Sequence, residues 1–223
     1  NDVFEEAFIF ATNGTELSIE WPKSVINECN KIKRDISAQD VNSRKDLRSL
    51  NFVTIDGSNA KDFDDAVYAE ESSDGFLLYV AIADVSEYVL QDSSLDKEAL
   101  SRATSVYFEK KVIPMLPELI SNKLCSLRPN EDKLVLTCEI YLDKDGEIKS
   151  FEFFNSVICS KNRLTYDEVE KFYQKGQTTL SNDIVSNLST LKKIHALRRK
   201  IREERKAIDF YLPEYRPVGK DNK

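Results

Sequence analysis

Four aspartates fall within ten residues of this chain: Asp56, Asp62, Asp64 and Asp65. Carboxylates held this close together repel one another unless a cation lies among them. Hard divalent cations, above all Mg²⁺, prefer such all-oxygen sites and keep positions open for waters and substrate phosphates. Two such ions about 3.5–4 Å apart can activate a water and stabilise the leaving oxygen of a phosphoryl displacement. The spacing therefore indicates metal-dependent phosphoryl chemistry.

Two other interpretations of the aspartate run are an ordinary Asp-rich surface turn and a calcium loop. Asp favours turns, so the first is common. The EF-hand pattern requires Gly at its sixth position and Glu at its twelfth, and neither is placed correctly here. Location favours a functional site, because Asp56 closes a predicted strand at 52–55 and a second strand is predicted at 66–69. We expect the intervening loop to fold back and bring the later aspartates beside Asp56.

Strong local patterns predict the elements that must hold this loop. Residues 76–83 are apolar on both faces, which predicts a buried central strand. Alternation before Asp145-Gly146 predicts a hairpin there. Ser93-x-x-Asp96 and the capping box Thr165-x-x-Glu168 each predict a helix start, and apolar residues between 184 and 201 predict a long helix.

The segment 1–50 carries weaker patterns. Alternation around Asn13-Gly14 predicts a hairpin over 5–21, and Pro22 is expected to open a helix. Residues 35–50 are polar without periodicity and are interpreted as a connector. We therefore divide the chain into 1–50, a hairpin-helix segment and connector, and 51–223, the main domain. The predicted fold class is α+β, with a mixed, mostly antiparallel curved sheet flanked by helices.

Composition excludes several function classes. The 223 residues carry a formal charge of −7, which argues against nucleic-acid binding by bulk positive charge. The six glycines form no G-x-G or P-loop, and the single His195 excludes a multi-histidine zinc site. The four cysteines form no C-x-x-C pair and are interpreted as buried residues in a reducing, cytoplasmic compartment. No apolar run approaches the roughly 20 residues of a membrane span. Because the chain starts at Asn1, we expect it to be a processed product or a piece of a longer protein.

The run from Thr54 to Val67 resembles the signature of the RNB catalytic domain of the RNase II/RNase R exoribonucleases. The resemblance continues in the same order over most of residues 45–210. Thr-Ile-Asp-Gly at 54–57 and Thr-Ser-Val-Tyr-Phe at 104–108 look closer to RNase R. Further matching blocks are Val80 to Ser86, Ile113 to Pro117, Leu119 to Leu127 and Arg163 to Tyr166.

This resemblance implies hydrolysis of RNA from a single-stranded 3′ end to 5′-mononucleotides with Mg²⁺, for which Mn²⁺ is an alternative. The four aspartates match the family's active-site aspartates by motif position. Asp56 and Asp65 are expected to bind the metal directly, Asp62 to support the metal shell, and loss of Asp64 to harm catalysis most. Tyr107 matches the aromatic residue that stacks on the 3′ base, and stacking accepts every base. Without the resemblance, Tyr107 would be interpreted as an ordinary strand tyrosine.

The resemblance also indicates what the chain does not contain. The family's downstream segment supplies an arginine and a glutamate to the active site, and flanking domains bind RNA. We therefore expect the isolated chain to be weakly active or inactive. The alternative is a catalytically silent RNA-binding or scaffold relative of the same fold. The four aspartates favour the enzyme, since a silent relative is free to lose them. Asp84 is a candidate fifth acidic group near the site, although a capping role is favoured.

Overall fold

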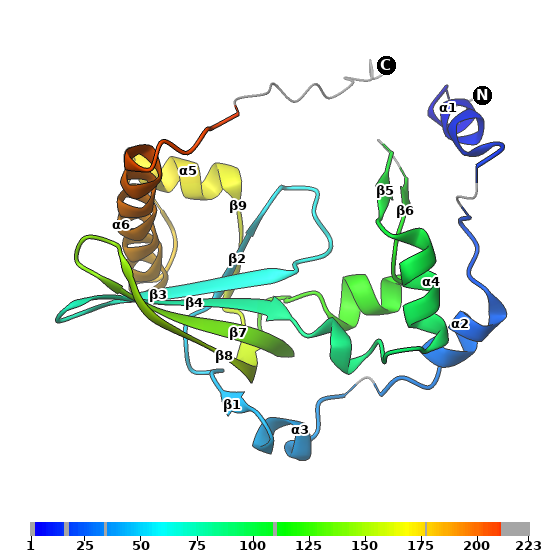
Figure 1. Cartoon of the computed structure of the whole chain (residues 1–223), viewed down its shortest axis with the longest axis horizontal. Helices are drawn as coiled ribbons and strands as arrows, with labels where there is room; N and C mark the ends of the chain where they lie inside the picture. Colours follow the sequence, from blue (N-terminus) through cyan, green and yellow to red (C-terminus); the bar gives the residue numbers. More distant parts are fainter. Residues whose placement is uncertain (1–2, 16–17, 34, 109–110, 177, 211–223) are drawn as a thin grey trace.

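The computed structural model describes residues 3–15, 18–33, 35–108, 111–176 and 178–210 (Figure 1). Within these ranges the main sheet has seven strands in the order β1-β8-β7-β4-β3-β2-β9. Its strands are β1 (Lys45–Asp46), β2 (Val53–Asp56), β3 (Asp65–Ser72), β4 (Gly75–Ala83), β7 (Asp132–Asp143), β8 (Ile148–Cys159) and β9 (Asn162–Thr165). Neighbouring strands are antiparallel except for the two edge pairs, β1 with β8 and β2 with β9. The predicted fold class is confirmed.

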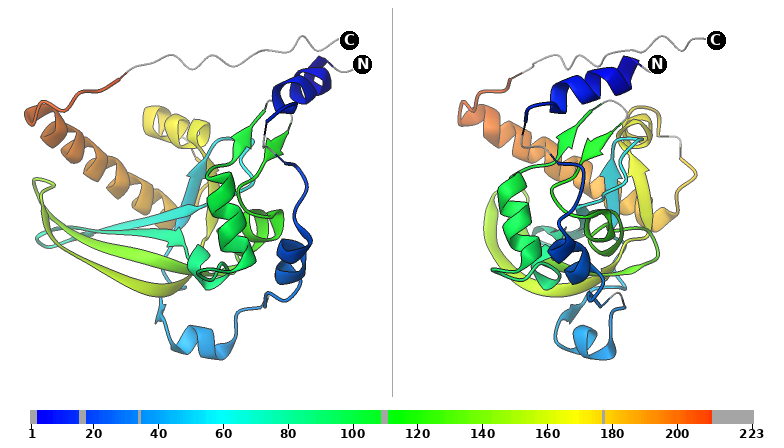
Figure 2. Two further views of the ribbon diagram at one scale, coloured as in Figure 1. Left: turned by 45° about the vertical axis from the view of Figure 1, so that its right-hand side comes forward. Right: turned by 90° about the vertical axis from the view of Figure 1, so that its right-hand side faces the viewer.

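Helices lie on both sides of the curved sheet (Figures 1 and 2). The α-helices are α1 (Val3–Thr12), α2 (Lys23–Cys29), α3 (Ala38–Asn42), α4 (Ser94–Arg102), α5 (Tyr166–Lys175) and α6 (Asn182–Glu204). Shorter elements are the 3₁₀ turn η1 (Val85–Glu87), the π-helical turn η2 (Ile120–Leu124) and a separate ribbon of β5 (Val106–Tyr107) with β6 (Val112–Ile113). None of the described helices is both long and apolar enough to cross a membrane.

The main hydrophobic core fills the space between the sheet and the segments α2, α4 and η2. Val25 of α2, Leu95 of α4 and Ile120 of η2 are each almost fully buried in one cluster with Ala81 and Val135 of the sheet. On the other face, α6 covers one end of the sheet through Leu188 and Ile194. Burial of these apolar surfaces is the main term that holds the layers together.

The helix starts predicted at Ser93 and Thr165 and the turn predicted at Gly146 are confirmed. Ser93 caps α4 by accepting a hydrogen bond from the amide of Asp96 at 3.1 Å. Thr165 and Glu168 form a complete capping box at the start of α5. Gly146 lies at the β7–β8 turn with a φ of 84°. That left-handed conformation favours glycine. The central strand β4 and the long helix α6 also lie where the sequence predicts them.

The predicted hairpin over residues 5–21 is wrong, because residues 3–12 form the helix α1. Phe8 is buried and packs edge-on against Phe108 with ring centres 4.7 Å apart, whereas Phe10 is 86% exposed. Two phenylalanines that alternation would place on one face of a strand therefore point in different directions on a helix. The segment 35–50 is also more ordered than predicted, since it contains α3 and β1. The helix after Pro22 is confirmed as α2.

Candidate active site

The first and last aspartates of the cluster stand on neighbouring strands. Asp56 is the final residue of β2, where it lies opposite Thr165 of the parallel strand β9. Asp65 is the first residue of β3, opposite Ile82 of β4. Strands β2 and β3 pair with each other in antiparallel fashion, so both carboxylates lie at the same end of two adjacent strands. The loop 57–64 joins them.

Hydrogen bonds to distant segments fix the second half of this loop. The buried Ser126 hydroxyl accepts from the Phe63 amide at 3.1 Å and donates to the Lys61 carbonyl at 3.2 Å. The Leu127 amide donates to the Phe63 carbonyl at 2.8 Å, and the Ala83 amide donates to the Asp64 carbonyl at 2.9 Å. Because the main chain is held at each of these points, the aspartates project from a defined scaffold.

Arg163 of β9 fixes the first half of the loop. Its Nη2 donates to the carbonyl oxygens of Gly57 at 2.9 Å and Ser58 at 2.8 Å. Its guanidinium lies 5.4 Å from the centre of the Phe63 ring. That separation is within the range of a cation–π contact. Its Nε is buried without a hydrogen-bond partner among the described residues. One side chain therefore contacts both ends of the aspartate loop.

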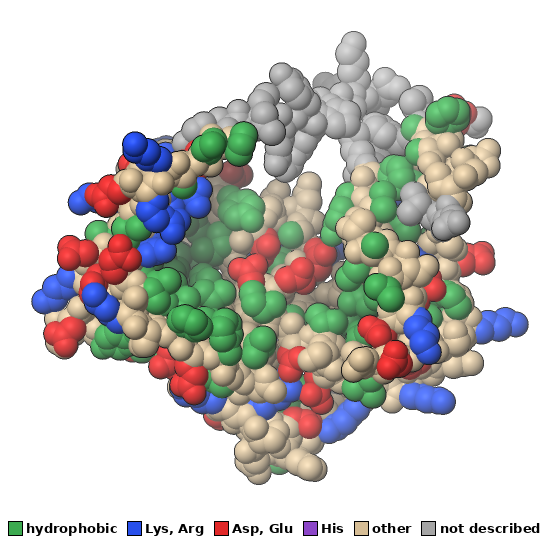
Figure 3. Space-filling model, in the orientation of Figure 1, with side chains coloured by type: hydrophobic (Ala, Val, Ile, Leu, Met, Phe, Trp, Pro, Cys, Tyr) green, Lys and Arg blue, Asp and Glu red, His purple; other side chains and the backbone are tan. Residues whose placement is uncertain are grey.

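The carboxylates lie within range of one another's charge. Burial and the charge of Asp65 raise the pKa of Asp56, with further contributions from Asp64 and Asp62, while the positive charge of Arg163 opposes them. Burial and the charges of Asp62 and Asp65 raise the pKa of Asp64. The structure thus brings the four predicted aspartates into one acidic group, in which burial and like charge disfavour the charged form of Asp56 and of Asp64. Figure 3 shows acidic side chains gathered in the hollowed centre of this face of the molecule.

The thiol of Cys125 lies near the acidic group, and the negative charge of that group contributes to raising its pKa. Burial, with the nearby charge of Asp64, raises the pKa of Cys125 to about 12. Cys125 is therefore protonated at neutral pH and is a small buried residue beside the site. The predicted burial is confirmed for Cys29 and Cys125, whereas Cys138 and Cys159 are only partly buried.

This acidic group fits a hard divalent cation by its donor chemistry. All of its side-chain donors are carboxylate oxygens, the ligands that Mg²⁺ prefers. Within the described ranges, however, no group of three or more Asp, Glu, His or Cys side chains is arranged to hold a metal ion. The donor chemistry of the group therefore fits such an ion, whereas the described side-chain positions do not form a closed ligand set.

Tyr107 is not part of this acidic group. It lies on the separate ribbon β5–β6, opposite Val112, and is 68% exposed. Exposure leaves an aromatic face available for stacking, and the place of Tyr107 in β5 equally fits an ordinary strand tyrosine. Its assignment to the 3′ base stays a prediction.

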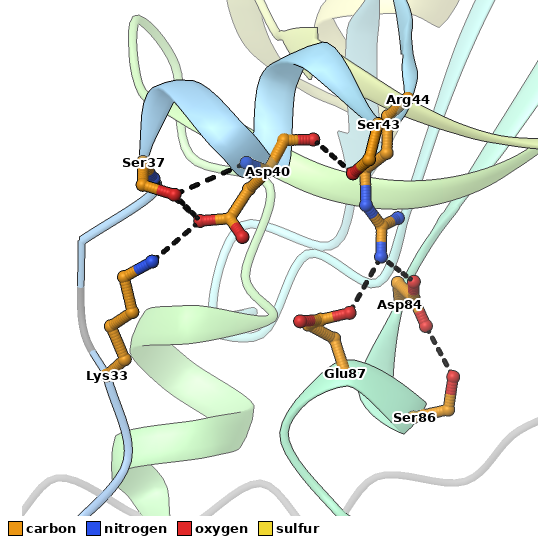
Figure 4. A network of polar contacts seen from close by, with 8 residues as sticks. All are labelled: Lys33, Ser37, Asp40, Ser43, Arg44, Asp84, Ser86 and Glu87. Atoms are coloured by element: carbon orange, nitrogen blue, oxygen red, sulfur yellow. Dashed lines mark hydrogen bonds and ion pairs between the residues drawn. The ribbon is translucent and has the colours of Figure 1, made fainter.

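Asp84 neither joins the acidic group nor caps η1 through its side chain. It forms an ion pair with Arg44 at 2.7 Å, and the two side chains are only 8% and 7% exposed (Figure 4). Ser86 donates to its other carboxylate oxygen at 2.6 Å, and Arg44 also contacts Glu87. Burial tends to raise the pKa of Asp84, but these hydrogen bonds and the Arg44 charge lower it overall. Its role is to fix the end of β4, one residue beyond the Ala83 amide that holds Asp64.

The sequence alone assigns no role to Arg163, Ser126 or Arg44. Each contacts a partner far along the chain, at separations of 106, 63 and 40 residues. No local pattern signals such a contact. Arg163 to Tyr166 and Leu119 to Leu127 are blocks of the family resemblance, which assigns these side chains no function.

Comparison with known proteins decides the family. The family model of the RNB domain matches residues 44–223. The chain belongs to the RNB domain family. This RNB chain is 45% identical over 193 residues to Ribonuclease R of Acidithiobacillus ferrooxidans, covering 86% of the chain and 44% of that relative. It is 42% identical over 202 residues to Ribonuclease R of Escherichia coli, covering 89% of the chain and 25% of that relative.

A solved structure supports the same assignment. Mycoplasma genitalium RNase R in complex with ribose-methylated single-stranded RNA matches with a TM-score of 0.85 and 35% identity. The match covers 92% of the RNB chain and 32% of that structure. The RNB chain thus spans less than half of each of these relatives.

Proposed function

We propose that this chain is the aspartate-bearing part of a Mg²⁺-dependent 3′-to-5′ exoribonuclease that releases 5′-mononucleotides. The observation that carries the proposal is the grouping of Asp56 and Asp65, at the ends of two paired strands, with Asp62 and Asp64 of the loop between them, in an RNB fold. The relatives named Ribonuclease R, and the M. genitalium enzyme solved with RNA, support RNA as the substrate.

The roles proposed for the four aspartates are those that the family resemblance implies, and their places on the scaffold are compatible with them. Asp56 and Asp65, each anchored in a strand, would bind Mg²⁺ directly, and Asp62 would support them from the loop. When bound, Mg²⁺ offsets the carboxylate charge and supplies the Lewis acidity that phosphodiester hydrolysis requires. Short Asp side chains reach new ligand positions by rotation about two side-chain torsions, without movement of the hydrogen-bonded main chain. Mn²⁺, another oxygen-seeking ion, is expected to substitute.

The remaining residues hold the substrate and the site. Arg163 and Ser126 keep the loop in place through the contacts described above. Tyr107 presents an exposed ring for the base at a single-stranded 3′ end. Asp64 stands among like charges and is held through its own carbonyl. It is the position where loss of the carboxylate is expected to cost the most activity.

The test uses 5′-labelled single-stranded RNA, with the complete product of the reading frame that encodes this chain and with the chain alone. Shortening from the 3′ end by the complete product, with mononucleotides released, is expected with Mg²⁺ and not with EDTA, and the chain alone is expected to give little or no shortening. Asp64→Asn should lower the rate about 100-fold or more while RNA binding persists. The matched control is Asp74→Asn, an exposed aspartate in the β3–β4 turn.

Unchanged hydrolysis by Asp64→Asn would refute the assignment of the site. Binding of RNA without shortening, by the complete product in Mg²⁺, would instead support the silent relative.

A further inference from the structure

The aspartate loop has a second face that the proposed reaction does not use. Alternate residues of the loop have different surroundings. Lys61 and Phe63 line a pocket of about 810 Å³. Asp62 and Asp64 instead contribute to the acidic group. One short run of chain therefore separates a carboxylate cluster from a distinct cavity.

Four positively charged side chains line this pocket: Lys61, Lys123, Arg128 and Arg163. Two carboxylates, Glu118 and Glu131, share the lining, and Glu131 is already paired with Lys133 at 2.9 Å. Within the described part of the chain, none of the four bases forms an ion pair with a carboxylate. The pocket is thus locally positive in a chain whose formal charge is −7.

Two of these bases are held in place by backbone carbonyls. The Arg128 Nη2 donates to the Asn122 carbonyl at 2.6 Å, and Arg163 is fixed on the loop as described. An arginine fork held by one of its nitrogens keeps further N–H donors available for an oxyanion. The pocket is also large enough for a nucleotide, since sites for small ligands typically measure roughly 300–1000 Å³.

We propose that this pocket binds the phosphate of a 5′-nucleotide, and specifically the mononucleotide released by the adjacent site. The terminal phosphate monoester carries close to two negative charges at neutral pH, whereas each backbone diester of RNA carries one. A pocket whose bases have no carboxylate partner favours the more highly charged group. The source of the nucleotide rests on the proposed function, but binding itself does not depend on it.

The test is calorimetric titration of AMP and UMP into the chain in EDTA, so that no hydrolysis is involved. AMP is expected to bind, adenosine to bind at least tenfold more weakly, and inorganic phosphate to compete. Lys123→Gln/Arg128→Gln should weaken AMP binding at least tenfold. The control, Lys144→Gln/Lys175→Gln, removes two exposed bases outside the pocket and should leave AMP binding unchanged. If the first double variant does not fold, as judged by its thermal melting curve, Lys123→Glu at an exposed position replaces it.

A second titration identifies the source of the phosphate. Single-stranded RNA without a terminal phosphate should bind wild type and Lys123→Gln/Arg128→Gln equally. If the double variant binds RNA more weakly than wild type, and wild type does not bind AMP, the proposal is overturned and the bases are assigned to the RNA backbone. Equal AMP binding by the pocket variant and its control would also overturn it. Asp64→Asn should keep AMP binding, so loss of hydrolysis and loss of the pocket are separable.

Discussion

Arg163 Nη2 lies 2.9 Å from the carbonyl oxygen of Gly57, the residue that directly follows Asp56. This contact joins the edge strand β9 to the aspartate loop and places a positive charge beside the cluster. Because Arg163 contacts the loop and not the reacting atoms, it is a positioning residue.

Arg163→Lys is expected to raise the Mg²⁺ concentration needed for half-maximal hydrolysis about tenfold. The guanidinium places one nitrogen, Nη2, within hydrogen-bond distance of both loop carbonyls, and a lysine has no planar group to hold a donor there, so Asp56 would lose its fixed position. The measurement is the rate of RNA hydrolysis by the complete product of the reading frame as the Mg²⁺ concentration is raised. The control is Arg198→Lys, an arginine that donates to the Gly146 carbonyl at 3.0 Å in the β7–β8 turn. A change of equal size in both variants would show that Arg163 is merely structural.

Ser126→Ala is expected to lower the free energy of unfolding by about 1–3 kcal/mol, the cost of an unsatisfied buried group. The substitution leaves the buried Phe63 amide without its acceptor. Chemical denaturation of the two proteins measures the difference. As a control, Ser150→Ala lies at an exposed position of β8. That change should alter stability by at most about 0.5 kcal/mol. A neutral Ser126→Ala would mean that the loop is held without this hydroxyl.

Mg²⁺ is expected to raise the melting temperature of the chain by relieving repulsion among the aspartates. A ligand that binds the folded state alone stabilises it by about 2.7 kcal/mol at 100 times its dissociation constant. Asp56→Asn/Asp65→Asn should abolish this shift in thermal melting. In EDTA, Asp64→Asn should be at least as stable as wild type, because it removes one of the repelling charges. A shift of the same size in the double variant would place the ion elsewhere.

The Arg44–Asp84 pair is expected to contribute stability that acid removes. The folded-state pKa of Asp84 is lowered. Its contribution is therefore complete above the ordinary unfolded value of about 3.9 and is lost as the pH falls through the lower folded value. Asp84→Asn should be destabilised at pH 7 by about 3–5 kcal/mol, since it leaves Arg44 buried and without its closest carboxylate. Its stability should approach that of wild type at low pH.

The check is urea unfolding from pH 7 down to pH 2. Several other carboxylates also have a lowered pKa, so the difference between wild type and variant, and not the wild-type curve, carries the result. The control, Glu71→Gln, breaks an exposed pair with Lys193. It should cost no more than about 1 kcal/mol at every pH. A difference that does not depend on pH would contradict the assigned role of Asp84.

The parts of this molecule that sequence predicts are those encoded by neighbouring residues. The capping box at Thr165, the β7–β8 turn at Gly146 and the spacing of the four aspartates each depend on residues close together in the chain. The segment that forms α1 is mispredicted because Phe8 and Phe10 stand two residues apart, which is the strand period, whereas the contact that buries Phe8 is made with Phe108, far along the chain.

The contacts that complete the site lie beyond local patterns. Arg163 reaches Gly57 because β9 pairs in parallel with β2, and Arg44 reaches Asp84 because the connector crosses to the end of β4. Neither partner has a sequence signal of its own, since both contacts depend on strand order. Only the resemblance to the RNB family indicates that the segments belong together.

The parallel pairing of β2 with β9 has a consequence for synthesis. The aspartates are translated before Arg163, whose side chain holds their loop and follows 106 residues after Gly57. At about 5–20 residues per second, a ribosome needs roughly 5–20 s to cover that distance. During this interval the nascent chain carries the carboxylates without the strand that fixes them. The aspartate loop therefore reaches its final position only after β9 has emerged and docked, so its completion waits for a strand made 106 residues later.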